Sequence, residues 1–561
     1  MESLASSKIQ NWLTWLLRGL LTLGFLILFA RIVDLQIIRG KYYRSLSEEN
    51  RIRRIAIAAP RGEILARGGE VIATNKLVRQ RIIFDSNKGY LKSTDLEGAA
   101  DDETITEWKR DYISGSAFAH ITGYLGEVDE GELGKINPQC PEKGPRKIAG
   151  LVGRSGLEEM YECALSGIDG EELFEVDSMG RKIRTLGRKE PVKGEGVRTT
   201  IDFGLQNEVA RIVEDSKDLP RSAKGSVIVS DPFGEILAVY SFPSYDPNIF
   251  IESDDPQEVS KILNNPSLPL FNRSISGLYH PGSTFKPILA VAALEEGKIN
   301  KDFEFDDKGR ITIQTEYGDF SFANWFFTQY GGTEGLIKLP RAIARSTDTF
   351  FYKVGELLGV DKLDEWADKF GLSQKTGIDL PGEAEGFIPT PKWKMQNIGE
   401  RWFLGNTYHL SIGQGYIAVT PLELNQAIST IANDGNYCKA HLINSKEECR
   451  NLGIDKENIE LVKSGMVGAC SPGGTGFTFF DFKDKKGINV ACKTGTAETE
   501  NGDPHAWFVA FAPAYTEASA GKPSESQITV TVLVENGGEG SKVAGPIARG
   551  MFDYWFDNKR E

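Results

Sequence analysis

Histidine and cysteine are scarce in this chain, and their scarcity limits the chemistry that it can perform. The 561 residues include five histidines and six cysteines. The histidines lack the spacing of metal ligands and no Cys-x-x-Cys motif occurs, so the sequence does not support a His/Cys metal site. We therefore predict no metal and no other cofactor.

An excess of positive charge is also missing. Lysine and arginine number 65 against 79 aspartates and glutamates, which gives a formal net charge of −14. Such a chain has no basic field to recruit phosphates, so we exclude a nucleic-acid partner. Hydrophobic residues make up 40% and charged residues 26%, as in globular proteins, and the length predicts two or more domains.

One apolar run near the N-terminus is about long enough to cross a bilayer. Residues 12–30 read WLTWLLRGLLTLGFLILFA, and the off-centre Arg18 can snorkel toward the N-terminal face. No small-x-small cleavage site follows, and a predicted helix continues over residues 31–54. We therefore predict one uncleaved anchor rather than a signal peptide or a buried helix. Lysine and arginine are more frequent after the run, which by itself favours a cytoplasmic location for the rest of the chain.

The chain behind the anchor divides into two parts. Alternating Val, Ile and Ala around Gly and Pro predict short strands over residues 53–75, and residues 94–116 predict an exposed loop or short helix. From residue 196 onward, strand patterns lie at both ends and helical patterns between them. That order predicts an α+β fold with one antiparallel sheet flanked by helices. The predicted strands lie within residues 225–243, 487–499, 505–515 and 526–538.

The even number of cysteines permits disulfide bonds in an oxidising compartment but does not require them. Cys438 and Cys449 flank one local segment. They form the pair that we expect to be bonded.

Residues 278–297, LYHPGSTFKPILAVAALEEG, raise a question about Ser283 and Lys286. A serine between a Pro-Gly turn and an apolar helical run is usually only a helix cap. On a helix, however, the Lys286 ammonium can reach the hydroxyl three residues earlier, and the helix dipole favours negative charge on the serine oxygen. Lysine has a free pKa of about 10.4, so burial or a second cation must lower it before Lys286 can act as a base.

Residues 493–496, KTGT, end a β-rich run and offer the second cation in Lys493. Because alternate side chains of a strand share a face, Lys493 and Gly495 point one way and the two threonines the other. Gly495 leaves room for a substrate strand to lie close against the sheet edge. Taken alone, the motif also fits a strand that ends on a solvated edge.

Residues 346–348, STD, come between the other two motifs. Ser346 is a candidate to relay a proton to or from the leaving group, and Asp348 to orient Lys286 or bind a substrate amide. Taken alone, the motif also fits a helix N-cap with an acidic first turn. The order Ser-x-x-Lys, Ser-x-Asp, Lys-Thr-Gly outweighs the separate alternatives, because this set, with Ser-Asp-Asn in the middle, marks penicillin-binding proteins and β-lactamases.

The chain resembles a class B penicillin-binding protein, a peptidoglycan transpeptidase, from the anchor to the C-terminus. Within the family, Ser-Thr-Asp followed by Thr-Phe-Phe-Tyr is most similar to the elongation-type penicillin-binding protein two. Many relatives have Asn where this chain has Asp348. Segments similar to family segments occur in family order at residues 59–73, 154–162, 199–206, 272–287, 346–359, 377–386, 410–424 and 493–499.

The resemblance implies the organisation of the chain and its place in the cell. It implies that the large domain lies on the periplasmic side of the cytoplasmic (inner) membrane, and we let this override the charge count because the substrate lies there. The shortened segment between residues 75 and 118 implies a reduced head on the pedestal. The implied parts are a cytoplasmic tail (1–11), a single-pass anchor (12–30), a β-rich pedestal similar to a dimerisation domain (33–195) and a penicillin-binding transpeptidase domain (196–561).

The resemblance also implies a role for each motif. Ser283 attacks the penultimate D-Ala carbonyl of a donor stem peptide, with Lys286 as general base. The backbone N–H groups of Ser283 and Thr496 form the oxyanion hole. Lys493, Thr494 and Thr496 hold the carboxylate of the donor or of a β-lactam. An acceptor amine then releases the acyl-enzyme and forms the cross-link.

The implied function is a serine-type D,D-transpeptidase in cell elongation and shape maintenance. Its implied partners are stem peptides ending in D-Ala-D-Ala, covalently inhibiting β-lactams, and a membrane glycan polymerase of the shape, elongation, division and sporulation family. Two alternatives are a D,D-carboxypeptidase or β-lactamase of the same fold and a non-catalytic anchored sensor of muropeptides or β-lactams. The anchor and long pedestal argue against a β-lactamase, and the intact motifs argue against a sensor.

Overall fold

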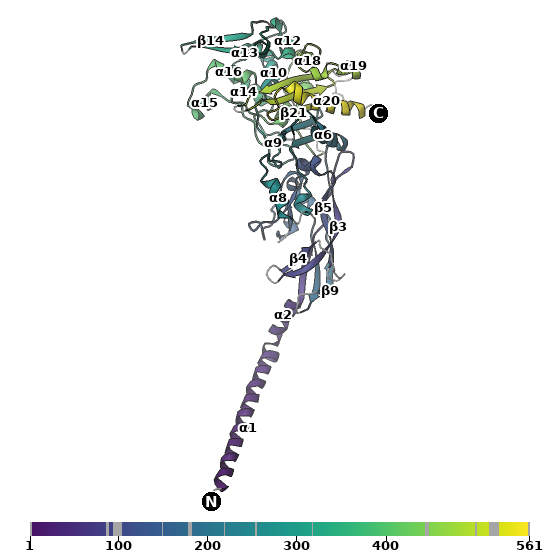
Figure 1. Cartoon of the computed structure of the whole chain (residues 1–561), viewed down its shortest axis with the longest axis vertical. Helices are drawn as coiled ribbons and strands as arrows, with labels where there is room; N and C mark the ends of the chain where they lie inside the picture. The colour runs from purple at the N-terminus through teal and green to yellow at the C-terminus, as the bar shows by residue number, and fades with distance from the viewer. Residues whose placement is uncertain are drawn as a thin grey trace. The chain divides into compact units, whose positions relative to one another are not determined.

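The chain folds into two compact units, and all the candidate site residues lie in the larger one (Figure 1). The smaller unit comprises Met1–Pro60, Lys76–Lys109 and Gly167–Lys193, and the larger unit the remaining residues. The computed structural model describes residues 3–85, 89–93, 104–147, 150–177, 182–217, 219–220, 222–252, 255–316, 318–443, 448–499, 502–514 and 527–558.

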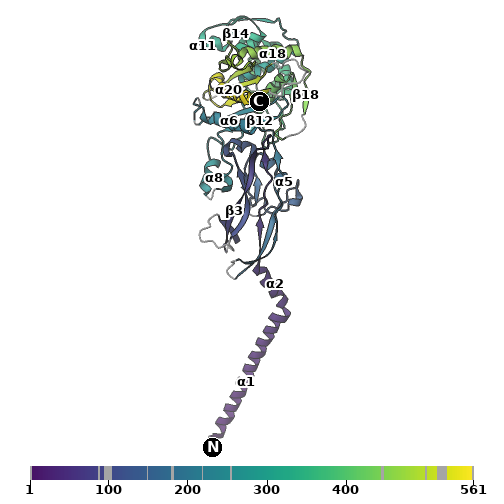
Figure 2. The same ribbon diagram turned by 90° about the vertical axis from the view of Figure 1, so that its right-hand side faces the viewer.

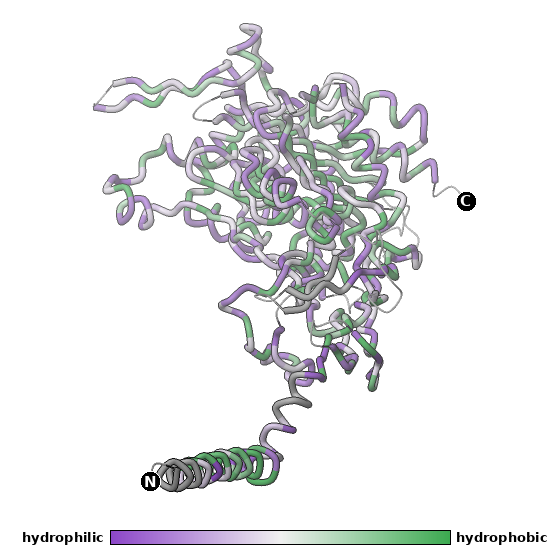
Figure 3. Tube along the Cα trace, turned by 60° about the horizontal axis from the view of Figure 1, so that its bottom comes forward, coloured by the Kyte–Doolittle hydropathy of each residue, from purple (hydrophilic) through white to green (hydrophobic). Residues whose placement is uncertain are grey.

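A long apolar helix begins the smaller unit. Helix α1 (Ser3–Val33) passes through a π-helical turn into α2 (Gly40–Arg51). The stretch Trp12–Ile38 is long and apolar enough to cross a membrane, and none of it is buried in the protein. Most of the described part of α1 is coloured as hydrophobic in Figure 3. The helix predicted over residues 31–54 ends at Arg51, because the chain enters a strand there.

The rest of the smaller unit is β-rich. Strands β1 (Ile52–Ile57), β8 (Gly170–Val176) and β9 (Lys182–Lys189) form an antiparallel sheet in the order β1-β8-β9. Strand β4 (Gly89–Ser93) pairs with the end of β3 (Val71–Asp85). The short strands predicted over residues 53–75 are therefore confirmed.

The prediction of an exposed loop or short helix over residues 94–116 was wrong for residues 104–112, whereas residues 113–116 form a turn and the start of the 3₁₀ helix η3 (Gly115–Phe118). Residues 104–112 form strand β5, which pairs with β3. Four residues of β5 are buried, and two of these four are the charged residues Glu107 and Arg110. Arg110 is buried in an ion pair of 2.7 Å with Glu158. Charged residues at inward positions conceal the apolar alternation by which strands are recognised.

The larger unit is organised around one five-stranded antiparallel sheet, which confirms the predicted fold class. The strand order is β12-β11-β21-β20-β19, so the chain's last strands insert between its earlier hairpin and the edge strand β19. The bounds are β11 (Gly225–Ser230), β12 (Ile236–Phe242), β19 (Ala491–Ala497), β20 (His505–Ala512) and β21 (Ile528–Val534).

Helices cover both faces of this sheet (Figures 1 and 2). On one face, α6 (Phe203–Asp215) and α20 (Gly540–Asn558) form a buried cluster that includes Phe508 of β20. On the other face, α10 (Lys286–Glu295) belongs to a second cluster with Trp507, the preceding residue of the same strand. Burial on both faces explains why these strands read as continuous apolar runs.

The remaining helices and strands of the described residues connect the elements named above. They are β2 (Ile64–Leu65), η3 (Gly115–Phe118), α3 (Ala119–Thr122), β6 (Leu125–Glu127), η4 (Pro141–Lys143), β7 (Leu151–Gly153), α4 (Gly156–Met160), α5 (Glu162–Leu165), β10 (Val197–Arg198), α7 (Ile249–Glu252), α8 (Pro256–Leu263), α9 (Arg273–Ser276), η5 (Gly282–Phe285), β13 (Glu304–Asp307), β14 (Arg310–Thr315), β15 (Gly318–Ala323), α11 (Trp325–Tyr330), β16 (Gly335–Lys338), α12 (Leu339–Arg345), α13 (Asp348–Leu358), α14 (Val360–Lys369), α15 (Pro391–Asn397), α16 (Leu404–Ser411), α17 (Pro421–Ala432), β17 (Asn436–Cys438), β18 (Cys449–Asn451), α18 (Lys456–Ala469), η6 (Phe477–Phe479) and α19 (Phe482–Lys486).

All six cysteines are paired in disulfide bonds. The predicted bond between Cys438 and Cys449 is confirmed, and it joins β17 to β18. The other two bonds, which the sequence did not predict, are Cys140–Cys163 and Cys470–Cys492. The last of these ties the end of α18 to β19, directly before Lys493.

Candidate active site

Ser283 lies in a tight turn rather than at a helix cap. The 3₁₀ turn η5 begins with Gly282 at φ +55°, and α10 starts only at Lys286. Neither η5 nor α10 has a side-chain cap, so the simple capping interpretation of Ser283 was wrong. Side chains three residues apart eclipse in a 3₁₀ turn, which places Ser283 and Lys286 on one side of it. Ser283 is partly exposed, whereas its neighbours in the turn are buried.

Lys286 is completely buried and holds three hydrogen bonds. Its ammonium donates to the Ser346 carbonyl oxygen over 2.9 Å and to Ser346 Oγ over 3.1 Å. The third bond, of 2.7 Å, goes to Asp348 Oδ1. Asp348 therefore orients Lys286, which is one of the two roles considered for it.

The middle motif joins two helices. Ser346 ends α12 in the left-handed conformation, with φ +56°, and Asp348 is the first residue of α13. A left-handed residue that is not glycine is uncommon and is kept only where the surroundings hold it. The sharp turn directs the Ser346 hydroxyl toward both lysines of the predicted site. Thr347 is the N-cap residue of α13 but makes no side-chain cap bond.

Lys493 projects from β19 into the same buried cluster. Its ammonium donates to Ser346 Oγ over 2.8 Å and to the Thr494 carbonyl oxygen over 2.9 Å. The hydroxyl of Ser346 thus accepts from two ammonium groups, and its own proton remains available to a third partner. We refer to Lys286, Ser346, Asp348 and Lys493 as the two-lysine cluster.

Burial and mutual repulsion disfavour two protonated lysines in this cluster. Burial lowers the pKa of Lys286 below its usual range, although the Asp348 carboxylate opposes this shift. Burial and the charge of Lys286 lower the pKa of Lys493 strongly. With one carboxylate beside two buried amines, the neutral form of one lysine is favoured more than it is for a lysine in water. Burial, one of the two causes that the sequence argument allowed, therefore lowers the pKa of Lys286, and Lys493 lies in the same cluster.

The Ser283 turn packs directly against the end of β19. A Cβ atom on Gly282 would lie 3.2 Å from the Thr496 carbonyl oxygen, and one on Gly495 would lie 2.9 Å from Thr284 Cγ2. Gly495 therefore makes room for the Ser283 turn, and the expected approach of a substrate strand to this sheet edge stays a prediction. Thr496 is exposed beside the turn.

Two further residues support the strand end, and the sequence motifs did not include them. Thr494 donates its hydroxyl to Thr475 Oγ1 over 2.9 Å. Gln414 Nε2 donates to the Thr496 carbonyl oxygen over 3.4 Å. Both partners come from Gly-rich segments, SPGGTG at residues 471–476 and GQG at residues 413–415, whose glycines could have marked them as close-packed loops.

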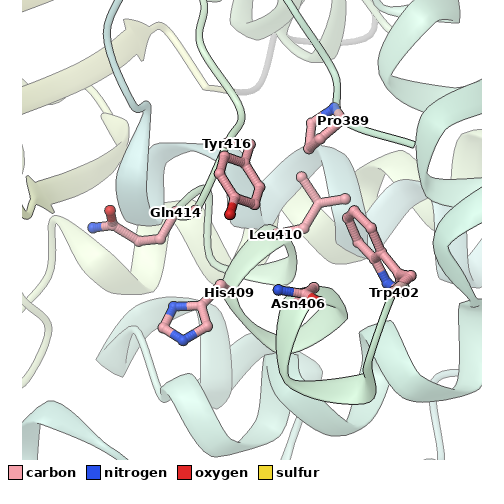
Figure 4. Close-up of a pocket in the computed structure, with 8 residues that line it drawn as sticks. Pro389, Trp402, Asn406, His409, Leu410, Gln414 and Tyr416 are labelled. Carbon is pink, nitrogen blue, oxygen red and sulfur yellow. The ribbon is translucent and has the colours of Figure 1, made fainter. Parts of the chain in front are cut away.

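The residues that line a cavity of about 200 Å³ include Gln414 (Figure 4). Trp402, Leu410 and Tyr416 supply apolar walls, and Gln414 belongs to the same lining. The segment that carries Gln414 also reaches the Ser283 turn, because the Gly282 N–H donates to the carbonyl oxygen next to Gln414, on Gly413, over 2.9 Å. Gln414 and Gly413 therefore connect the lining of the cavity to the strand end and to the Ser283 turn by hydrogen bonds.

Comparisons with known proteins agree with this site. Residues 225–553 match the family model described as penicillin binding protein transpeptidase domain, and residues 92–199 match that of the penicillin-binding protein dimerisation domain. The first match covers more than half of the chain. The chain belongs to the penicillin-binding protein transpeptidase family.

Relatives define its place within that family. The chain is 31% identical to peptidoglycan D,D-transpeptidase MrdA of Escherichia coli strain K12, over 94% of this chain and 91% of the relative. The predicted resemblance to penicillin-binding protein two and the predicted function, peptidoglycan D,D-transpeptidation, are thereby confirmed.

Solved structures show the same arrangement over most of the chain. PBP2 of Helicobacter pylori, in a complex with MreC, is 25% identical with a TM-score of 0.74 and covers 91% of this chain and 99% of that one. A chain from a structure described as "Structural coordination of polymerization and crosslinking by a peptidoglycan synthase complex" is 27% identical with a TM-score of 0.74. It covers 97% of this chain and 98% of that one.

Proposed function

We propose that this transpeptidase works through a serine acyl-enzyme on Ser283. The observation that carries the proposal is the two-lysine cluster, in which the Ser346 hydroxyl accepts hydrogen bonds from Lys286 and Lys493. A buried amine with a lowered pKa, one 3₁₀ turn from an accessible serine, fits the requirement for a base without histidine.

The acylation step proceeds as follows. Neutral Lys286 accepts the Ser283 hydroxyl proton while Oγ bonds to the carbonyl carbon of the penultimate D-Ala. The backbone N–H groups of Ser283 and Thr496 stabilise the oxyanion. The C–N bond to the terminal D-Ala then breaks, and the proton passes from Lys286 through Ser346 to the leaving amine. The products are an ester on Ser283 and free D-Ala.

The second step forms the cross-link. The amine of a second stem peptide attacks the ester carbonyl and loses a proton to the lysine–serine relay. The bond to Ser283 Oγ breaks, and Oγ regains a proton from Lys286. One peptide bond replaces the one that was broken, so no energy source or cofactor enters the reaction.

Substrate groups have matching positions around Ser283. Lys493, Thr494 and Thr496 hold the terminal carboxylate of the donor, and a β-lactam carboxylate takes the same place. Gly495 keeps the strand end against the Ser283 turn. The cavity lined by Gln414 takes a stem-peptide side chain of the donor, and the hydrogen bond from Gln414 to the Thr496 carbonyl oxygen supports this assignment.

The chain acts outside the cytoplasm, anchored by its apolar helix. The Trp12–Ile38 stretch supports a single membrane span. Three disulfide bonds support an oxidising compartment for the large domain. The described relatives also support the earlier expectation of a membrane glycan polymerase of the shape, elongation, division and sporulation family as partner, because one comes from a structure about the coordination of polymerization and crosslinking.

The proposal is tested with the full-length protein and glycan strands that carry uncross-linked pentapeptides. Muropeptide dimers and free D-Ala should appear in equal amounts, and Ser283→Ala should give neither. A Lys286→Ala variant should lose about 1,000-fold or more in rate, the scale of removing a catalytic base and its relay. Dimers formed by Ser283→Ala would refute the acyl-enzyme. Release of D-Ala without dimers would identify a carboxypeptidase instead.

A further inference from the structure

A buried carboxylate outside the three motifs lies behind the two-lysine cluster. Asp307, the last residue of β13, is 1% exposed. Its Oδ1 accepts hydrogen bonds from Gly309 N over 2.9 Å and Thr349 Oγ1 over 2.7 Å. Its Oδ2 accepts from Glu334 N over 2.9 Å and Asn324 Nδ2 over 3.3 Å. Four donors from four segments therefore meet on one side chain.

Asn324 connects this carboxylate to the middle motif. Its side chain is completely buried, and its Oδ1 accepts a hydrogen bond of 3.1 Å from the Asp348 backbone N–H. The next residue, Trp325, donates its backbone N–H to Asp348 Oδ2 over 3.0 Å. Since Asp348 Oδ1 accepts from Lys286, both oxygens of Asp348 are fixed.

Burying a carboxylate such as that of Asp307 among neutral donors costs free energy of desolvation. Removing such a group from water is strongly unfavourable, and hydrogen bonds compensate for it only when every lone pair is matched. The four donors on Asp307 meet that condition. An apolar residue would fill the same space, but it could not fix the amide of Asn324, whose orientation depends on an acceptor at Asp307.

We propose that Asp307 and Asn324 are positioning residues of the transpeptidase reaction, which hold the Asp348 carboxylate against Lys286 and so set the rate at which Ser283 is acylated. The inference rests on the proposed roles of Ser283 and Lys286. Neither positioning residue contacts the substrate. Their effect passes through the backbone and carboxylate of Asp348.

An Asp307→Asn variant tests the chain of contacts with almost no change in volume. Its amide group would face two N–H donors, those of Asn324 and Glu334, in place of the carboxylate oxygen. Asn324 would lose its anchor, and Asp348 would be held less well. The acylation rate constant should fall about 10- to 100-fold, the usual scale for a small misplacement of a reacting group.

The variant should also move the pH profile of acylation to lower pH. The charged groups that face Lys286 are Asp348 on α13 and Lys493 on β19. The Asp348 carboxylate raises the pKa of Lys286, so a carboxylate held less closely lets that pKa fall further. A purely structural defect would lower the amount of active protein and leave the profile in place.

An exchange of the two side chains provides a rescue. In Asp307→Asn combined with Asn324→Asp, the carboxylate at 324 can accept from both the Asp348 N–H and the new amide. Most of the lost rate should return. Asp306→Asn is the matched control, because Asp306 is on the same strand with its side chain 56% exposed and 3.8 Å from Lys308. It should acylate at the rate of the unmodified protein.

The measurement is the rate constant for acylation of the full-length protein by a fluorescent penicillin, from about pH 6 to 10. The amplitude counts folded sites, so a poorly folded variant still yields a rate. A slower Asp307→Asn with a displaced profile, rescued by the exchange, supports the proposal. An unchanged rate and profile, a loss of amplitude alone, or an exchange variant no faster than Asp307→Asn would overturn it. Labelling of Ser283→Ala in the same assay would instead refute the acyl-enzyme.

Discussion

Lys493 Nζ lies 2.8 Å from Ser346 Oγ, so the last of the three sequence motifs meets the middle one at a single hydroxyl. The residues are 147 positions apart in the chain. Lys286, from the first motif, donates to the same oxygen. This shared acceptor makes the protonation of each lysine depend on the other.

Replacing Lys493 by methionine should separate stability from activity. The ammonium is completely buried, and an apolar chain of similar volume avoids its desolvation cost. We expect an equal or higher thermal midpoint. The acylation rate should fall by about 100-fold or more, because the donor for the substrate carboxylate is lost. Thermal melts and penicillin acylation of Lys493→Met check both. A fast but unstable variant would contradict the assigned role.

Lys463→Met is the matched control for that substitution. Lys463 is also buried, and it donates to Asp434 Oδ1 and the Ala432 carbonyl oxygen, away from the motifs. It should keep the acylation rate of the unmodified protein.

The acylation rate should rise with pH through the lowered pKa of Lys286, because only the neutral amine accepts the serine proton. The midpoint of the rising limb of the rate–pH profile should therefore lie at a pH below the usual lysine pKa of about 10.5. In Lys493→Met the neighbouring cation is gone, so the pKa of Lys286 should rise and the limb should move to higher pH. This direction is opposite to that expected for Asp307→Asn. An unshifted limb would show that the two lysines titrate independently.

Gly495→Ala should disturb the Ser283 turn. The added methyl group would lie 2.9 Å from both Thr284 Cγ2 and Trp507 Cβ, closer than real contacts allow. Overpacking of this kind costs about 1–3 kcal/mol, and here it pushes on the turn that carries Ser283. Both the thermal midpoint and the acylation rate should fall. In Gly187→Ala, where nothing lies within 4 Å, neither should change.

His120 should make the protein less stable in mild acid. Burial lowers its pKa from 6.5 to about 4, and its Nε2–H donates to the Pro269 carbonyl oxygen over 2.9 Å. Between these two values the unfolded chain binds more protons than the folded one, so stability is complete above pH 6.5 and falls as the pH drops toward 4. The contribution is at most about 3 kcal/mol.

A His120→Gln variant, which keeps a donor for Pro269 but does not titrate, isolates this effect. Its thermal midpoint should fall less steeply than that of the unmodified protein between pH 7 and 4. Parallel curves for the two proteins would rule out His120 as the source.

The sheet could be predicted from the sequence because its strands carry a strong local signal. Residues 506–515 form a nearly continuous apolar run and residues 528–534 read ITVTVLV, a run of β-branched residues and leucine, as expected for strands buried on both faces. The three motifs could also be recognised from local sequence, because the residues of each motif lie within four consecutive positions. Strand β5 gave no such signal, because Arg110 faces inward to meet Glu158, a residue far along the chain.

The supporting layer of the site could not be predicted in this way. Asp307 and Asn324 reach Asp348 only after β13 and α11 fold against α13, and neither residue stands in a periodic pattern. The Cys470–Cys492 bond likewise depends on α18 lying beside β19. Contacts of this kind follow from tertiary packing, about which spacing along the chain contains little information.

The position of the acyl group after reaction with a β-lactam tests the central claim most directly. Mass spectrometry of peptides from the inactivated full-length protein should find the whole mass of the β-lactam added to the peptide that contains Ser283. An adduct on the peptide that contains Ser346, or an inactivated protein with no adduct on either serine, would contradict the account.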